Sequence, residues 1–283
     1  MPHQHGHTQD LDWSKMLEAL TSADDIEAGV DAQIAEWLLT GRERLVYDLG
    51  CGAGGMTAAL RAAAAAGARI VAVDGERALL DATRRRAEVE TQLADLGAEI
   101  PIAPASADLI WASGVIHHLP DQQAVLNDLA ARLAPGGLLA LGEGGLHMRS
   151  LPRDLGMGEP GLEMRLDAAQ DRWFTAMRRD LPGSLPMPYG WSTALHRAGL
   201  DEVTSKSFLL DLPAPLGAPA AEYVISRLRG LLERDNVIGL IGDEDRDLLR
   251  RVTDPADAVN QAVRADLFLL AVKTVHVGRR PVG

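Results

Sequence analysis

Short apolar runs alternate with longer amphipathic stretches through the first half of the chain, beginning near Leu45. The short runs predict strands, and the stretches in which apolar residues recur at helical spacing predict helices. The expected strands cover 44–48, 69–73, 90–94, 108–113 and 138–143, and the expected helices cover 56–66, 76–88 and 121–133. This alternation favours an α/β fold, with a parallel sheet that carries helices on both faces. Ligands of such sheets bind beyond the carboxyl ends of the strands.

The pattern changes on either side of this region. Upstream, two helices are expected, over 12–20 and 31–39. Downstream, residues 144–161 are rich in Gly, Pro and Arg, and a helix with clustered aromatic residues is expected over 167–179. The other expected elements are a helix over 191–198, strands over 203–210 and 267–277, and helices near 219–234, 244–252 and 256–265. The aromatic helix is either a lid over a binding site or a surface helix that buries its apolar stripe.

The sharpest local motif follows the first strand. Asp48-Leu49-Gly50-Cys51-Gly52-Ala53-Gly54-Gly55 breaks an apolar run and leads into an alanine-rich helix. Glycines let the backbone approach a ligand closely, and the N-terminus of a helix suits a carboxylate or a phosphate. Asp74, Asp95 and Ser113 follow the next three expected strands, and an acid at the second strand typically holds ribose hydroxyls. The pattern therefore indicates a nucleotide-type ligand.

Taken in order, these motifs resemble the class I S-adenosylmethionine (SAM)-dependent methyltransferases. Residues 48–54 look like the family's Asp-x-Gly-x-Gly-x-Gly motif, and the segment 117–121 (His-His-Leu-Pro-Asp) and an expected turn at 133–137 (Leu-Ala-Pro-Gly-Gly) are typical of later positions. The resemblance covers about residues 32–145. It implies a Rossmann-like, seven-stranded, mostly parallel sheet whose last strand is antiparallel, together with N-terminal helices and a helical cap or insertion. It also implies SAM as cofactor and S-adenosylhomocysteine as product.

The resemblance also assigns residues to the cofactor. The glycine loop would run along the methionine part, Asp74 would bind the ribose hydroxyls, Asp95 would reach the adenine amino group, and Ser113 would lie near the sulfur. The alternatives for Asp48 and Asp95 are a turn-stabilising residue and a surface acid. The full set of expected cofactor residues is Asp48, Gly50, Cys51, Gly52, Asp74, Gly75, Asp95, Leu96, Ser113 and Gly114.

The acceptor side is less defined by the sequence. SAM already carries the positive charge on sulfur, so the protein mainly supplies alignment and a dry pocket, and a base is needed only if the acceptor must lose a proton. The candidate catalytic residues are His117, His118, Glu143 and His147. A neutral histidine is a natural base near pH 7, although each of these residues could instead serve only packing and hydrogen bonding. Arg149 and Arg153 could hold an acidic acceptor.

Composition and charge limit the classes of partner that the protein can bind. The chain has 283 residues, a net charge of −12 and no basic run beyond residues 84–86, which counts against nucleic acid. Its single cysteine excludes an intrachain disulfide. No secretory signal and no apolar run long enough for a membrane are evident, so a cytoplasmic protein is expected. His3, His5 and His7 could bind a metal only adventitiously, and no metal site is predicted. A homodimer is possible.

The expected division of the chain is a tail with helices at 1–40, a SAM-binding core at 41–145, a lid and substrate region at 146–200, and C-terminal strands at 201–283 with a helical insertion at about 218–265. The expected function is methylation of a small organic molecule, with a specialised metabolite as the candidate acceptor. The alternatives are a SAM-binding protein with other chemistry such as cyclisation, an NAD-dependent oxidoreductase, and a non-catalytic SAM sensor.

Overall fold

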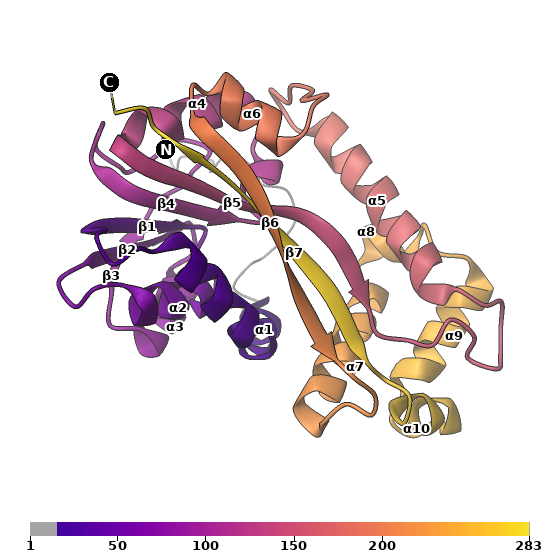
Figure 1. Cartoon of the computed structure of the whole chain (residues 1–283). Helices are drawn as coiled ribbons and strands as arrows, with labels where there is room; N and C mark the ends of the chain where they lie inside the picture. Colours follow the sequence, from indigo (N-terminus) through magenta and orange to yellow (C-terminus); the bar gives the residue numbers. More distant parts are fainter. Residues whose placement is uncertain (1–15, 283) are drawn as a thin grey trace, which may run out of the picture. The chain divides into compact units, whose positions relative to one another are not determined.

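The computed structural model describes residues 16–282, whose elements alternate as the sequence predicts (Figure 1). The strands are β1 (Leu45–Leu49), β2 (Arg69–Asp74), β3 (Glu90–Leu93), β4 (Ala107–Ser113), β5 (Leu133–Arg149), β6 (Asp201–Leu212) and β7 (Leu269–Arg279). The helices are α1 (Leu17–Leu38), α2 (Gly55–Ala63), α3 (Arg77–Arg86), the 3-10 helix η2 (Ile116–His118), α4 (Gln122–Arg132), α5 (Leu162–Asp180), α6 (Trp191–Arg197), α7 (Ala218–Leu232), α8 (Asp235–Ile238), α9 (Asp243–Thr253) and α10 (Ala258–Arg264).

These elements fold into two compact units. The core unit comprises the described residues up to Gly144, residues Leu181–Phe208 and the residues from Lys273 onward. The accessory unit comprises Gly145–Asp180 and Leu209–Val272. The segment 146–200, expected as one lid region, is therefore divided between the two units at residue 180.

The sheet has the order β3-β2-β1-β4-β5-β7-β6. The pairs β1–β2, β2–β3, β1–β4 and β4–β5 are parallel. The N–H of Gly136 donates to the carbonyl of Arg280 and the N–H of Arg280 donates to the carbonyl of Gly137, so β7 runs antiparallel to β5. The chain turns from one half of the sheet to the other between β1 and β4, which is where open α/β sheets bind ligands. The predicted fold class, including the antiparallel last strand, is confirmed.

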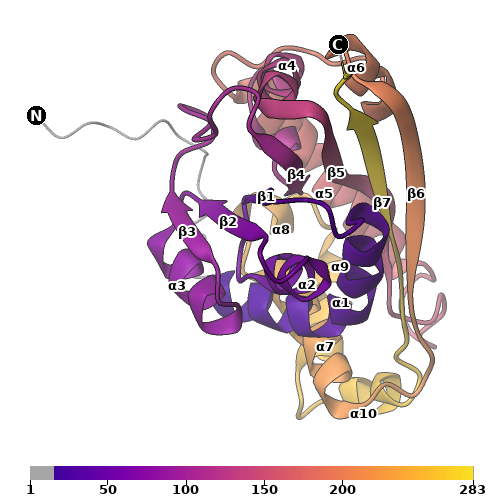
Figure 2. The same ribbon diagram turned by 60° about the vertical axis from the view of Figure 1, so that its left-hand side comes forward.

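Helices cover both faces of the sheet in the core unit (Figures 1 and 2). The helices α1, α2 and α3 lie on one face, and α4 and α6 lie on the other. On the second face, Leu126 and Leu129 of α4 and Leu195 of α6 join a buried cluster with strand residues such as Ile110 and Leu139. These side chains are almost wholly removed from water, which provides the main driving force for this packing.

The two expected N-terminal helices are in fact one. Residues 17–38 form the continuous helix α1, and the part of the first prediction before residue 16 lies outside the described residues. The stretch 21–25 between the two expected helices is rich in Thr, Ser and Asp, which favour caps and turns over helix interiors. In the structure these side chains have partners: Thr21 donates to the carbonyl of Leu17, and Asp24 and Asp25 bind groups on α2 and α3.

The strand expected at 138–143 is also longer than predicted, because β5 covers Leu133–Arg149. The Pro-Gly-Gly segment that suggested a turn lies inside β5, where Gly136 has a φ of 77° and the register with β4 shifts. A Cβ at Gly137 would lie 2.6 Å from the carbonyl oxygen of Ala107, so only glycine allows this close approach. A β-bulge therefore replaces the expected turn.

The accessory unit is helical apart from the ends of β5, β6 and β7. Its core includes Val224, Leu228 and Leu249, which are at most 1% exposed. The buried carboxylate of Glu163 accepts hydrogen bonds from the backbone and hydroxyl of Ser150. The short helix α8 was not anticipated. No helix within residues 16–282 has the length and apolar composition needed to cross a bilayer.

Candidate functional site

The glycine loop is fixed by backbone geometry. The N–H groups of Gly50 and Cys51 both donate to the carbonyl of Val73, at 2.8 and 3.1 Å. Gly50 has a φ of 67°, and a Cβ there would lie 2.3 Å from Cγ2 of Val115. Only glycine at position 50 allows both the left-handed backbone conformation and the close approach of the loop to the segment after β4. Cys51 is buried, and burial raises the pKa of its thiol, which is the opposite of what a nucleophile requires.

Asp74, at the end of β2, is buried against this loop. One carboxylate oxygen accepts the N–H of Gly52 at 3.0 Å, and the other accepts the N–H of Glu76 at 3.0 Å. Burial raises the pKa of Asp74. Each oxygen keeps a second lone pair, so the carboxylate can hold the loop and still accept hydroxyl donors from a ligand. Gly75 beside it is exposed.

Asp48, at the end of β1, is 2% exposed. Its carboxylate accepts the hydroxyl of Thr57, on α2, at 2.5 Å. Burial raises the pKa of Asp48 to about 7, and the hydrogen bond from Thr57 opposes this shift. The buried side chain of Asp48 therefore links the end of β1 to α2.

Sequence reasoning missed Asp24 of α1. Its carboxylate accepts the N–H of Gly55, the first residue of α2, at 2.8 Å. Burial raises the pKa of Asp24 to about 6. The helix N-terminus that was expected to receive an anionic group of a ligand thus already has a side-chain carboxylate on it. No local pattern could have found this contact, because Asp24 and Gly55 are brought together only by packing of α1 on α2.

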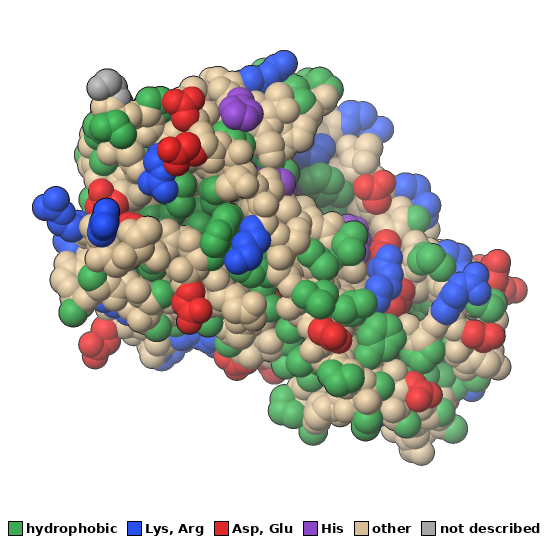
Figure 3. All heavy atoms as spheres, viewed as in Figure 1, with side chains coloured by type: hydrophobic (Ala, Val, Ile, Leu, Met, Phe, Trp, Pro, Cys, Tyr) green, Lys and Arg blue, Asp and Glu red, His purple; other side chains and the backbone are tan. Residues whose placement is uncertain are grey.

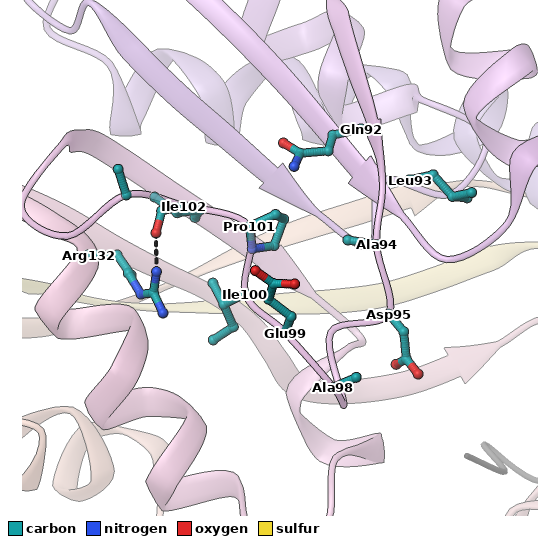
Figure 4. Close-up of a pocket in the computed structure, with 11 residues that line it drawn as sticks. Gln92, Leu93, Ala94, Asp95, Ala98, Glu99, Ile100, Pro101, Ile102 and Arg132 are labelled. Atoms are coloured by element: carbon teal, nitrogen blue, oxygen red, sulfur yellow. Dashed lines mark hydrogen bonds between the residues drawn. The ribbon is translucent and has the colours of Figure 1, made fainter. Parts of the chain in front are cut away.

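Asp95 and Leu96 follow β3. Asp95 is exposed, and its carboxylate accepts the N–H of Gly97 at 2.9 Å, while Leu96 packs against the core. Asp95 also lines a cavity of about 520 Å³ that includes Arg132 (Figure 4). In Figure 4 its carboxylate points to the side of the loop away from Arg132.

Ser113 and Gly114 end β4 beside β5. The hydroxyl of Ser113 and the N–H of Gly114 both donate to the carbonyl of Gly142, each at 3.1 Å. Gly114 is exposed with a φ of 65°. These two residues therefore lie at the carboxyl edge of the sheet, as expected from the sequence.

Two of the candidate catalytic residues form a pair. Nδ1 of His117 lies 2.6 Å from one carboxylate oxygen of Glu143, which is 3% exposed. The other oxygen accepts the N–H groups of Val115 and Ile116, at 3.2 and 3.0 Å. Because a carboxylate only accepts, Nδ1 carries the ring proton and Nε2 carries the basic lone pair. The ring of His118 lies 4.2 Å from that of His117, centre to centre.

A second histidine, missed by sequence reasoning, supports this pair. Nε2 of His276, on β7, lies 3.2 Å from the backbone carbonyl of Glu143, and its Nδ1 lies 2.7 Å from the hydroxyl of Ser205. A carbonyl only accepts, so Nε2 is the protonated nitrogen and Nδ1 accepts from Ser205. Burial lowers the pKa of His276, which favours this neutral form.

His147 belongs to the accessory unit. Its Nδ1 lies 3.4 Å from the carboxylate of Asp167, which also binds the guanidinium of Arg149 at 2.5 Å. Arg149, suggested as a partner of an acidic acceptor, therefore already has a carboxylate partner. Arg153 is exposed.

The charges around the loop fit a cationic ligand. The half-buried Asp24 and the buried Asp31 and Asp74 each raise the pKa of Asp48, so several carboxylates gather in the region around the loop. Lys273 offsets part of their charge by binding Glu27 and Asp31 at 2.5 and 2.9 Å. Sulfonium and ammonium groups complement such a field, whereas the phosphates of a dinucleotide would be repelled by it.

Comparisons with known proteins agree with this chemistry. Residues 47–139 match the family model described as a methyltransferase domain. The trans-aconitate 2-methyltransferase of Azoarcus sp. (strain BH72) is 43% identical over 97 residues, which are 34% of this chain and 37% of that protein. The 27-O-demethylrifamycin SV methyltransferase of Amycolatopsis mediterranei (strain S699) is 32% identical over 146 residues, which are 49% of this chain and 50% of that protein. The alignments thus span about half or less of these relatives.

Solved structures show the same fold. Phosphoethanolamine N-methyltransferase 2 of Haemonchus contortus, solved with phosphomonomethylethanolamine and S-adenosylhomocysteine, has a TM-score of 0.50 at 14% identity, covering 96% of this chain and 61% of that chain. The cyclase SpnF has a TM-score of 0.51 at 14% identity, covering 90% of this chain and 82% of that chain. The fold and the loop define a SAM-binding α/β protein. Residues 47–139, a third of the chain, match a methyltransferase domain, which supports the class I SAM-dependent methyltransferase family that the motifs predicted, with SAM as its cofactor.

Proposed function

We propose that this protein transfers the methyl group of SAM to a small organic acceptor whose attacking atom carries a proton, such as a hydroxyl or an N–H group. The observation that carries the proposal is the pairing of His117 with the buried Glu143 at the carboxyl edge of the sheet. A carboxylate oxygen as attacking atom would need no base, so the pair would be superfluous for such an acceptor.

The protein's part in the reaction is to bind, align and accept a proton. SAM supplies an activated methyl group for in-line displacement. Asp74 is the residue we expect to hold the ribose, and the loop around Gly52 would hold the methionine end, while the buried Asp48 binds Thr57 of α2. His117 takes the acceptor's proton on Nε2, and Glu143 fixes the ring and its tautomer. Correct alignment contributes up to about 7–11 kcal/mol and a positioned base about 10²–10⁴-fold in rate.

We assign acceptor recognition to the accessory unit. The family match ends at residue 139, before this unit begins at Gly145. The methyltransferases that resemble part of this chain are named for acceptors as different as trans-aconitate and a rifamycin. A shared cofactor region beside unmatched residues is what variable acceptors require. His147 belongs to this unit, so we place it with acceptor recognition.

We further propose a small-molecule partner in the cytoplasm. The net charge of −12 supports this over a nucleic acid. On the face drawn in Figure 3, Lys and Arg side chains alternate with Asp and Glu and form no continuous basic surface. A homodimer stays a prediction.

Mass spectrometry of the purified protein tests the cofactor and acceptor together. We expect co-purified SAM or S-adenosylhomocysteine, and formation of S-adenosylhomocysteine when hydroxyl- or amine-bearing metabolites are supplied. Binding of SAM without turnover on any acceptor, but with conversion of a metabolite to an isomer, would instead favour a cyclase.

The pair of Glu143 and His117 has its own test. In Glu143→Gln the side chain has two orientations, and neither preserves the native contacts. Either its NH2 group faces the two backbone N–H donors, or its NH2 group donates to Nδ1 of His117 and the ring proton moves to Nε2. We expect kcat to fall by about 10²–10⁴-fold, with SAM affinity within about twofold of the native value. His118→Ala is the comparison variant: it removes the ring whose centre lies 4.2 Å from that of His117 and keeps Glu143, so kcat should fall less than in Glu143→Gln. Equal kcat in Glu143→Gln and the native enzyme contradicts the base.

A further inference from the structure

We propose that Asp24 selects the cofactor, because its carboxylate closes the N-terminus of α2 to phosphate groups and adds negative charge for a cationic ligand. This inference concerns cofactor choice and does not depend on which acceptor is methylated. It assigns a role to a carboxylate of α1 that binds the first N–H of α2 and that no strand-end motif predicts.

The contact lies at the point where a nucleotide phosphate would bind in a related fold. After a glycine-rich loop, the first N–H groups of the following helix and its positive dipole end form an anion site. Here the N–H of Gly55, the first residue of α2, donates to Asp24 at 2.8 Å. An incoming phosphate would have to displace a carboxylate and would meet its charge.

Asp24 is packed into this position. A Cβ at Gly55 would lie 2.5 Å from Cγ of Asp24, so the carboxylate rests directly on the helix backbone. On the other side, Arg86 of α3 lies 4.0 Å from Asp24 and binds Asp25 at 2.6 Å. The pairing of Lys273 with Glu27 and Asp31 holds the next turn of the same helix to β7. Contacts of α1 with α2, α3 and β7 therefore fix the position of Asp24.

The charge also acts on the pocket beyond its own hydrogen bond. Asp24 is among the carboxylates that raise the pKa of Asp48, so the two groups share a poorly solvated region. Removing one charge there weakens the attraction for sulfonium and ammonium groups and lowers the repulsion of phosphates at the same time. Both effects change the preference between the two ligand classes in the same direction.

Asp24→Asn tests this role, because asparagine keeps an acceptor oxygen for Gly55 and removes the charge. The readout is the ratio of the affinities for SAM and for ADP, measured by calorimetry on the full chain. We expect this preference for SAM to fall at least tenfold, or about 1.4 kcal/mol. Asp25→Asn is the matched control, since it removes an adjacent charge on α1 that binds Arg86 and does not contact Gly55. We expect less than a twofold change in that variant.

Two results would overturn the role of Asp24 in cofactor selection. A preference that changes by less than threefold in a folded Asp24→Asn protein overturns the proposal, and so does an equal change in Asp25→Asn, because the effect would then be general charge. If Asp24→Asn does not fold, Gly55→Ala replaces it: the added methyl displaces the carboxylate without removing its charge. The preference must fall in that variant as well, and an unchanged ratio refutes the role of Asp24. If the ratio falls as expected but the native protein forms no S-adenosylhomocysteine with any acceptor, the role of Asp24 stands and the proposed methyl transfer fails.

Discussion

Asp48→Asn should make the ligand-free protein more stable and flatten its stability against pH. Asp48 is 2% exposed, and burial raises its pKa from 3.8 to about 7. Ionisation of this side chain at neutral pH therefore opposes folding. Asparagine has nearly the same shape, can accept the Thr57 hydroxyl with its carbonyl oxygen, and carries no charge.

The sign and the size follow from proton linkage. An acid whose folded pKa lies above its unfolded pKa binds more protons in the folded state, so stability falls as pH rises through the interval between the two values. With values of 3.8 and about 7, the contribution of Asp48 to the free energy of unfolding falls by about 2 kcal/mol between about pH 5.5 and about pH 7.5. For a unit as large as the core unit, a fall of about 2 kcal/mol in the free energy of unfolding corresponds to a decrease of about 4–8 °C in Tm.

The assay is thermal and urea unfolding of the ligand-free protein across this pH range. We expect the native chain to gain stability on acidification and Asp48→Asn to gain about 2 kcal/mol less. Part of the native gain remains in the variant, because burial also raises the pKa of Asp24 and Asp74. Parallel pH profiles for the two proteins would refute the reasoning, since they would mean that burial does not raise the pKa of Asp48.

Three further outcomes are expected. Asp74→Ala should weaken SAM binding at least tenfold, about 1.4 kcal/mol, because the variant loses both the expected ribose contact and the carboxylate that holds Gly52; unchanged affinity in calorimetry would remove it from the site. Lys273→Met leaves the buried Asp31 without its cation and should lower the free energy of unfolding by about 3–5 kcal/mol in urea titrations, whereas an unchanged free energy of unfolding would mean that this ion pair makes no net contribution to stability. His117→Ala should reduce turnover with SAM affinity nearly intact, and full activity in stopped assays would exclude it as the base.

The sequence located the cofactor region because its signals are local. The strand ends at Asp48, Asp74 and Ser113 follow from short apolar runs that stop at polar residues, and the glycine loop follows from a backbone that other residues cannot adopt. The sequence erred where a local signal was overruled by packing. The polar stretch near Asp24 continues as helix because its side chains find partners on α2 and α3, and the Pro-Gly-Gly segment continues as strand because β4 accommodates a bulge.

The primary structure alone determined the α/β alternation, the methyltransferase motifs and the edge of the sheet at which we expect the cofactor. Periodicity and glycine spacing express constraints within a few residues, and these survive in any fold that the chain adopts. Only the tertiary structure decided which acids and bases act together. Asp24 meets Gly55, Glu143 meets His117, and Lys273 meets Asp31 through contacts between residues 26 to 242 positions apart. Such contacts arise from packing of whole helices and strands, and no short stretch of sequence encodes them.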